Sequence, residues 1–142
     1  MRTRKAKPTD LLANVPLFAG CSAKDIQRIG RLVTEVKVPA GKVLCREGDS
    51  GTEAFIIAEG EADIRLKGKS LATLGPGQVV GEMSLIDQAP RSATVTANDD
   101  MTLFVLESRE FWTLVSDNPL IARKLLKNLA QRLREAEGAP TH

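Results

Sequence analysis

A carboxylate and a guanidinium, nine residues apart, stand in the segment of the chain that carries its most recognisable chemistry. Glu82 can accept hydrogen bonds from hydroxyl groups such as those of a sugar. Arg91 lies among small and apolar residues, and its paired donors match the oxygens of a phosphate. A buried charge is costly without a partner, so Arg91 needs an anion. The two residues indicate a ligand with a phosphate and sugar hydroxyls, or alternatively a Glu82–Arg91 salt bridge in an ordinary connection.

Glycines surround this segment and allow a bound group to come close to the backbone. Gly75 and Gly77 precede it, and Gly81 opens it. Residues 82–86 are expected to form one helical turn, whose exposed N–H groups suit an anion. The chain then passes through Pro90 into the next strand. We therefore expect an anion-binding loop between two strands.

Short strands must position this loop. From residue 33 to residue 106, β-branched and apolar runs alternate with glycines, which is typical of strands and tight turns. Ala62, Ile64 and Leu66 alternate with charged residues and are expected to face an interior. Eight runs predict a mainly β fold, an eight-stranded jelly-roll β-barrel (double-stranded β-helix) with flanking helices. The expected strands are 34–38, 43–46, 54–58, 62–66, 70–74, 78–80, 93–97 and 102–106.

Helices are expected on both sides of the strands. Ser22 can cap a helix over 23–32, and Ser108 can cap a second one that runs to residue 115. Pro119 is suited to the first turn of a last, long helix. That helix is amphipathic and is expected to end at residues 138–140. Its apolar residues recur every four positions: Ile121, Leu125, Leu129 and Leu133.

Composition and charge exclude several classes of function. No stretch approaches the roughly 20 apolar residues that span a bilayer, and the N-terminus lacks an apolar signal region, so we expect a cytoplasmic protein without membrane association. Residues 8–118 hold 11 basic and 16 acidic groups, a net charge of −5, which disfavours direct binding to nucleic acid. Cys21 and Cys45 fit no metal-ligand spacing and are expected to be reduced packing residues.

An enzyme is not expected. The sole histidine is His142, there is no tyrosine, and neither cysteine has a nearby base. No histidine-based zinc site can therefore be assembled, and we expect no metal. Glu82 and Asp87 are two carboxylates that would have to act without other catalytic groups.

The sequence resembles the cyclic nucleotide-binding domain family, which includes catabolite activators, kinase regulatory subunits and cyclic-nucleotide-gated channels. The resemblance is carried by the phosphate-binding cassette, here Gly-Glu-Met-Ser-Leu at 81–85 and Pro-Arg-Ser-Ala-Thr-Val at 90–95. It extends over about residues 11–134, with Val-Pro-Leu-Phe at 15–18, Pro-Ala-Gly at 39–41, Glu-Gly-Asp at 47–49 and Leu-Gly-Pro-Gly at 74–77. A regulatory domain that binds cAMP or cGMP is implied.

The resemblance assigns roles to residues of the cassette. Arg91 is expected to bind the cyclic phosphate and Glu82 the ribose 2′-hydroxyl, and Gly81 to allow close approach. Ser92 stands where relatives that favour cGMP often have threonine and relatives that favour cAMP often have alanine or serine, so the serine favours cAMP. Backbone amides around Met83, Ser84 and Ser92, followed by Ala93, are expected to complete the anion cradle. The base is expected to lie against Ala62, Ile64 and Leu74.

The last helix is expected to act as a lid. The resemblance places it over the base, where Arg123, Leu126, Lys127 and Asn128 are candidates, although catabolite activators have hydroxyl residues where this chain has Ala136 and Glu137. We hypothesise that phosphate capture moves Leu85, whose contact with Phe111 or Trp112 sets the angle of the helix. The helix could instead pair with a second copy in a homodimer.

The expected organisation is one domain over residues 11–137. It comprises a helical lead-in (11–32), the barrel (33–106), and hinge and lid helices (108–137), with a flexible basic tail at 1–10 and a flexible end at 138–142. Two alternatives stay open. The chain could be the excised sensor of a transcription regulator or channel, or a non-binding barrel used for protein interaction. The sequence does not identify the downstream effector.

Overall fold

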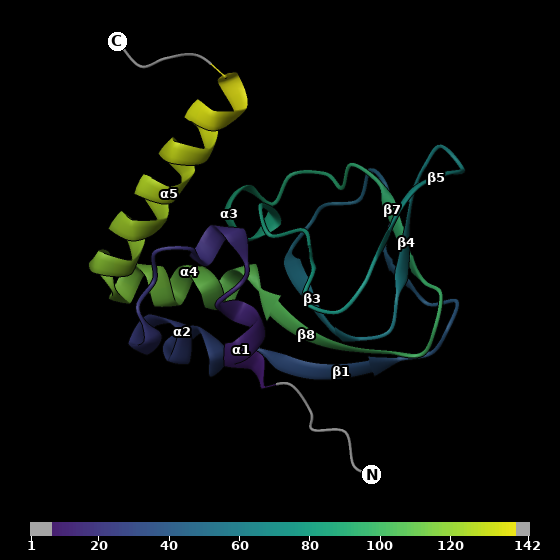
Figure 1. Cartoon of the computed structure of the whole chain (residues 1–142), viewed down its shortest axis with the longest axis horizontal. Coiled ribbons are helices and arrows are strands. Elements are labelled where there is room, and N and C mark those ends of the chain that lie inside the picture. Colours follow the sequence, from purple (N-terminus) through teal and green to yellow (C-terminus); the bar gives the residue numbers. More distant parts are fainter. Residues whose placement is uncertain (1–6, 139–142) are drawn as a thin grey trace.

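The computed structural model describes residues 7–138, which form two four-stranded antiparallel sheets with helices gathered at one end (Figure 1). One sheet has the order β1-β8-β3-β6, formed by Thr34–Val38, Met101–Glu107, Glu53–Glu59 and Val79–Val80. The other has the order β2-β7-β4-β5, formed by Val43–Cys45, Thr94–Ala97, Ala62–Leu66 and Lys69–Leu74. All eight predicted strands are present, and no strand end differs from its predicted position by more than one residue.

The predicted mainly β jelly roll of eight strands is confirmed, but its two sheets do not close into a barrel within residues 7–138. Two of the four edge strands are short. The strand β6 has only two residues, and β2 has three with an irregular register against β7. The strands therefore form a double-sheet arrangement, and the helices, gathered at one end of it (Figure 1), pack on one face of the sheet β1-β8-β3-β6 through residues of β3 and β8.

The alternation along β4 is modified at Asp63. Its carboxylate is 7% exposed, although the pattern places it on the face opposite Ala62 and Ile64. The hydroxyl of Ser70 donates to it at 2.6 Å and Nε of Arg65 at 2.7 Å. These bonds hold the pKa of Asp63 below its usual range, Ser70 having the larger effect. Both partners of the buried carboxylate therefore lie within the β4–β5 hairpin.

Helices precede and follow the sheets. Those before β1 are α1 (Pro8–Leu12), the 3-10 turn η1 (Pro16–Phe18) and α2 (Ala23–Gly30). A short α3 (Ser84–Asp87) lies in the predicted loop, and α4 (Ser108–Asp117) and α5 (Pro119–Glu137) end the described chain. None of the helices within residues 7–138 is both long and apolar enough to cross a membrane.

The helix ends test three expectations. Ser22 caps α2 as predicted, in a reciprocal capping box with Asp25. Pro119 opens α5, and Gly138 ends it. The predicted cap at Ser108 is wrong, because Glu107 holds the cap position. The hydroxyl of Ser108 instead donates to the carbonyl of Leu85 at 2.9 Å.

The predicted tail at 1–10 overlaps helix α1, since Pro8 to Asp10 are helical. The first helix thus begins before the expected domain boundary at residue 11. Residues 1–6 of that tail, and residues 139–142, lie outside the described residues.

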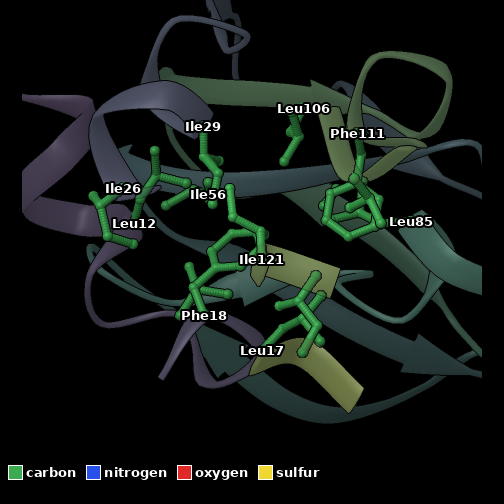
Figure 2. Packing of buried hydrophobic residues seen from close by; sticks show 14 of the residues in the cluster. Leu12, Leu17, Phe18, Ile26, Ile29, Ile56, Leu85, Leu106, Phe111 and Ile121 are labelled. Atoms are coloured by element: carbon green, nitrogen blue, oxygen red, sulfur yellow. The ribbon is translucent and has the colours of Figure 1, made fainter. Parts of the chain in front are cut away.

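Two hydrophobic clusters share the sheet β1-β8-β3-β6. On one side, Ile56 and Leu106 meet side chains of the helices (Figure 2). On the other side, Phe55 and Ile57 pack with residues of the second sheet such as Val95. Successive residues of β3 thus point into different clusters, as expected for a strand covered on both faces. The labelled members of the helical cluster are Leu12, Leu17, Phe18, Ile26, Ile29, Ile56, Leu85, Leu106, Phe111 and Ile121 (Figure 2).

Candidate functional site

Arg91 is a buried cation held by neutral groups. Its side chain belongs to a residue that is 8% exposed. Nη2 donates to the carbonyl oxygen of Glu53 at 2.8 Å, Nη1 donates to Oγ of Ser84 at 3.2 Å, and the guanidinium lies 5.9 Å from the centre of the Phe55 ring. No carboxylate within residues 7–138 forms an ion pair with it. The positive charge is therefore fixed in place without a neutralising acid, as the sequence-based need for an anion predicts.

The backbone around Arg91 is fixed by the facing loop. Its N–H donates to the carbonyl of Asp49 at 2.7 Å, and its carbonyl accepts from the N–H of Gly48 at 2.9 Å. The neighbouring Pro90 forms an isolated bridge with Ser50. The loop between β2 and β3 thus orients the guanidinium, and sequence reasoning gave this loop no role in the site.

Two glycines make room for the guanidinium. A Cβ on Gly51 would lie 2.8 Å from Cβ of Ser84 and 3.0 Å from Nε of Arg91. A Cβ on Gly81 would collide with Nη1 of Arg91, and Gly81 also has a φ of +75°. Gly81 was expected to permit close approach of a ligand, and the structure shows that it permits close approach of Arg91. The spatial role of Gly51 has no signal in the sequence beyond its residue type.

A cavity of about 310 Å³ lies beside Arg91. Ten residues were predicted to contact ligand, and eight of them line it, whereas Ala62 is fully buried in the sheet cluster and Glu82 is absent from the lining. The predicted residues that line it are Ile64, Leu74, Gly81, Met83, Ser84, Arg91, Ser92 and Ala93. Lining residues that were not predicted are Cys45, Val79, Val80, Asp87, Ala89, Pro90 and Val95.

Three residues of the cavity lining have unpaired amide N–H groups. The amide N–H groups of Met83, Ser92 and Ala93 donate no hydrogen bond to any residue of the described chain. The N–H of Ser84, which was expected to join them, is taken by the carbonyl of Gly81 at 3.0 Å. Ser84 contributes its hydroxyl instead, as an acceptor from Arg91. The arrangement of one guanidinium and three amides is suited to a phosphate.

Cys45 forms part of the cavity wall. Its Sγ lies 3.8 Å from the carbonyl of Ala93, a weak hydrogen-bond contact. Burial raises the pKa of the Cys45 thiol, and the nearby charge of Arg91 opposes that rise in part. The thiol is therefore neutral at physiological pH and contributes a small apolar surface, as the sequence-based interpretation of both cysteines proposed.

The carboxylate of Glu82 lies on the side of the loop away from the cavity. Oε2 accepts a hydrogen bond from the N–H of Leu17 at 2.9 Å, and Oε1 accepts from Nη2 of Arg132 at 3.2 Å. The Glu82 side chain is only 14% exposed. The alternative of a Glu82–Arg91 salt bridge is not what the structure shows. The actual partners of Glu82 are 65 and 50 residues away in sequence, so no local sequence pattern predicts them.

The proposed lid residues do not meet the cavity in this arrangement. Arg123, Leu126 and Lys127 lie on exposed parts of α5, with Leu126 67% exposed. None of them, nor Asn128, lines the cavity beside Arg91. In Figure 1, α5 rises from the end of α4 on the side away from β4 and β5. A separate hollow of about 660 Å³ lies between α5 and the η1 turn.

Of the three proposed hinge residues, Leu85 and Phe111 are buried in the same cluster and Trp112 is exposed. Leu85 and Phe111 belong to the same cluster and are each 1% exposed (Figure 2). Trp112 is 42% exposed and stacks edge-on against Phe111, with ring centres 6.0 Å apart. The α3 turn thus reaches the helical core through Leu85.

Comparison with known proteins identifies the family of this chain. The family described as "Cyclic nucleotide-binding domain" matches residues 35–118. The chain is 38% identical over 129 residues to a cyclic nucleotide-gated potassium channel of Mesorhizobium japonicum, which covers 91% of this chain and 36% of the channel. The chain therefore spans little more than a third of that relative's length.

Two solved structures share the fold. The N-terminal domain of a transcriptional regulator from Streptomyces coelicolor matches with a TM-score of 0.82 and 31% identity, over 93% of this chain and 95% of that one. The regulatory domain of Toxoplasma gondii PKA, solved with cAMP, matches with a TM-score of 0.69 and 31% identity, over 78% of this chain and 44% of that one. With the family match across the cavity-forming segment, these likenesses show that the chain belongs to the cyclic nucleotide-binding domain family.

Proposed function

We propose that the cavity beside Arg91 is where this regulatory domain takes its cyclic nucleotide, with the cyclic phosphate on the guanidinium. The observation that carries the proposal is the buried cation without an acid partner among the described residues, together with three residues of the cavity lining whose amide N–H groups have no acceptor among the described residues. A monoanionic phosphate supplies the negative charge and the acceptor oxygens that these groups lack. The apolar part of the wall, Ile64, Leu74 and Val79, is suited to the face of a base.

We propose cAMP as the ligand in preference to cGMP. Ser92 lines the cavity next to Arg91, where the family resemblance associates threonine with cGMP. The Toxoplasma structure that this chain resembles was solved with cAMP. A cytoplasmic location stays a prediction from the sequence.

In the bound state we propose that Glu82 accepts the ribose 2′-hydroxyl and that α5 moves to cover the base. Both steps require a change from the arrangement described here, because Glu82 faces η1 and α5. Leu126 and Leu133 are 67% and 60% exposed, which leaves an apolar face of α5 available for a base or for a second copy of the chain. The role of the domain is thus to convert binding into a change at α5, with catalysis assigned to no residue.

Calorimetric titration with cAMP, cGMP and 5′-AMP tests the proposal. We expect binding of cAMP, weaker binding of cGMP, and the weakest binding of 5′-AMP, which lacks the cyclic phosphate. Replacing Arg91 with alanine should weaken cAMP binding by about 2–5 kcal/mol, the scale for truncating one partner of a buried charge pair. The matched control is Arg109→Ala, because Arg109 is an exposed arginine on α4 outside the cavity.

The same titration separates the alternatives. Absence of heat with every nucleotide, in protein shown to be folded by circular dichroism, would favour a non-binding domain used for protein interaction. Equal affinity of the Arg91→Ala variant and the Arg109→Ala control would contradict the role assigned to Arg91. An Arg91→Lys variant keeps the charge but loses the paired donors, and it should fall between the two.

A further inference from the structure

Helix α5 is docked on the N-terminal helices by a row of three polar side chains. Lys124, Asn128 and Arg132 recur every four residues and therefore share one face of the helix. Nζ of Lys124 donates to Oδ2 of Asp25 at 2.7 Å. Nδ2 of Asn128 donates to two backbone carbonyls of the η1 turn, at 3.0 and 2.9 Å. Arg132 completes the row with its bond to Glu82. We call these three residues the docking row.

The last member of the docking row holds a residue of the cassette. Glu82 stands between Gly81 and Met83, which both line the cavity, while its own carboxylate points to the helices. Its two oxygens bond to Arg132 and to the N–H of Leu17. A single carboxylate therefore lies between the ligand cavity and the docked α5.

The docking row supplies the polar contacts that join the C-terminal half of α5 to the rest of the domain. Ile121 and Leu125 are the buried residues that the described helix contributes, and both lie in its first two turns. Beyond them, Leu126 and Leu133 are exposed, and Leu129 is only partly buried against the helical cluster. Asn128 and Arg132 thus supply the polar contacts that keep residues 126–137 in place.

Those contacts are incompletely satisfied. Oδ1 of Asn128 and Nη1 of Arg132 are buried but have no hydrogen-bond partner within the described residues. The Arg132 side chain is 36% exposed, so water can replace Glu82 as its partner. A docked state with unsatisfied polar atoms is readily displaced by a competitor for Glu82.

We infer that Arg132 and the nucleotide compete for the carboxylate of Glu82, so that the docked α5 restrains ligand binding and ligand binding releases the end of α5. This inference rests on the proposed function of Glu82 as the acceptor of a ribose hydroxyl. In the docked state the oxygens of Glu82 are committed to Arg132 and Leu17. Only molecules in which the carboxylate is released bind fully, so the apparent affinity equals the intrinsic affinity multiplied by the fraction of molecules in that state. Linkage makes the effect reciprocal, because whatever frees Glu82 strengthens binding.

The test compares variants at two members of the docking row. Arg132→Gln removes the competitor directly, and Lys124→Gln weakens the docked state at the opposite end of the row without contacting Glu82. We expect both variants to bind cAMP more tightly than the wild-type protein in calorimetry, by about threefold to tenfold. The matched control is Arg134→Gln, an exposed arginine of the same helix, and it should bind as the wild type does.

Amide hydrogen exchange without nucleotide supplies a second readout. Residues 128–137 should exchange faster in Arg132→Gln than in the wild type or in Arg134→Gln. If the wild-type protein binds cAMP and the Arg132→Gln and Lys124→Gln variants bind it equally well or more weakly, the inference is overturned while the proposed function stands. If the wild type binds no cyclic nucleotide, the proposed function fails, and the inference fails with it.

Discussion

Three glycine-to-alanine substitutions isolate the space that Arg91 needs. Gly77 has a φ of +88° and no atom within 4 Å of the position that a Cβ would take, so alanine there meets only backbone strain. Gly51 has no such strained φ, but its added Cβ would press on Ser84 and Arg91. Gly81 combines the strain with a collision against Arg91. The three variants therefore separate strain from collision.

The expected losses of unfolding free energy follow from these two causes. A left-handed backbone costs a residue with a side chain about 1–2 kcal/mol, which is the cost expected for Gly77→Ala. Overpacking costs about 1–3 kcal/mol, which applies to Gly51→Ala. Gly81→Ala should lose about 2–5 kcal/mol, since both causes act together. Urea unfolding followed by circular dichroism measures each value.

The effects on nucleotide binding should follow the collision and not the strain. In Gly51→Ala and Gly81→Ala the guanidinium must move, and losing one charge-assisted hydrogen bond costs about 1.5–3 kcal/mol, roughly 10- to 150-fold in Kd. Gly77→Ala should keep the wild-type Kd for cAMP. A folded Gly51→Ala protein with wild-type affinity would refute the reasoning. A Gly77→Ala protein that loses as much affinity as Gly81→Ala would assign the effect to strain in the loop.

Two further predictions concern an ion pair and a thiol. The Lys124 hydrogen bond lowers the pKa of Asp25, so Asp25 should stabilise the fold above about pH 4, and this advantage over an Asp25→Asn variant should vanish as pH falls through the lowered pKa. Unfolding curves from pH 7 to pH 2 measure it, and a constant difference would contradict it. In a Cys21→Ala background, cAMP should slow alkylation of Cys45 at pH 9, measured by mass spectrometry, because the ligand covers the cavity wall. An unchanged rate would place the ligand elsewhere.

Much of the fold follows from local patterns. Glycines that alternate with β-branched runs located every strand, because turns and strands leave local signals in a chain. The capping box at Ser22 was likewise readable, since its partner Asp25 is three residues away. Ser108 failed the same rule because a tertiary partner, the carbonyl of Leu85, recruits its hydroxyl. Whether eight strands close into a barrel depends on how their edges meet, which no alternation pattern specifies.

The site divides in the same way. The burial of Arg91 could be predicted, because its neighbours in sequence are small or apolar and continue into a strand. The contribution of Gly51 could not be predicted, since it comes from a loop about 40 residues away whose position the fold alone decides. The partners of Glu82 were hidden for the same reason. A family resemblance predicts which residues form the cassette, whereas the hydrogen-bond partners of those residues depend on where distant helices dock.

The sheet β1-β8-β3-β6, with one cluster on each face, acts as a partition. Ile56 belongs to the helical compartment and its neighbour Ile57 to the compartment between the sheets, so adjacent positions of one strand report on different halves of the molecule. Leu85 connects the cassette to the helical side only. The helices therefore contact one face of this sheet, and a rearrangement of the helices there need not disturb the packing between the two sheets.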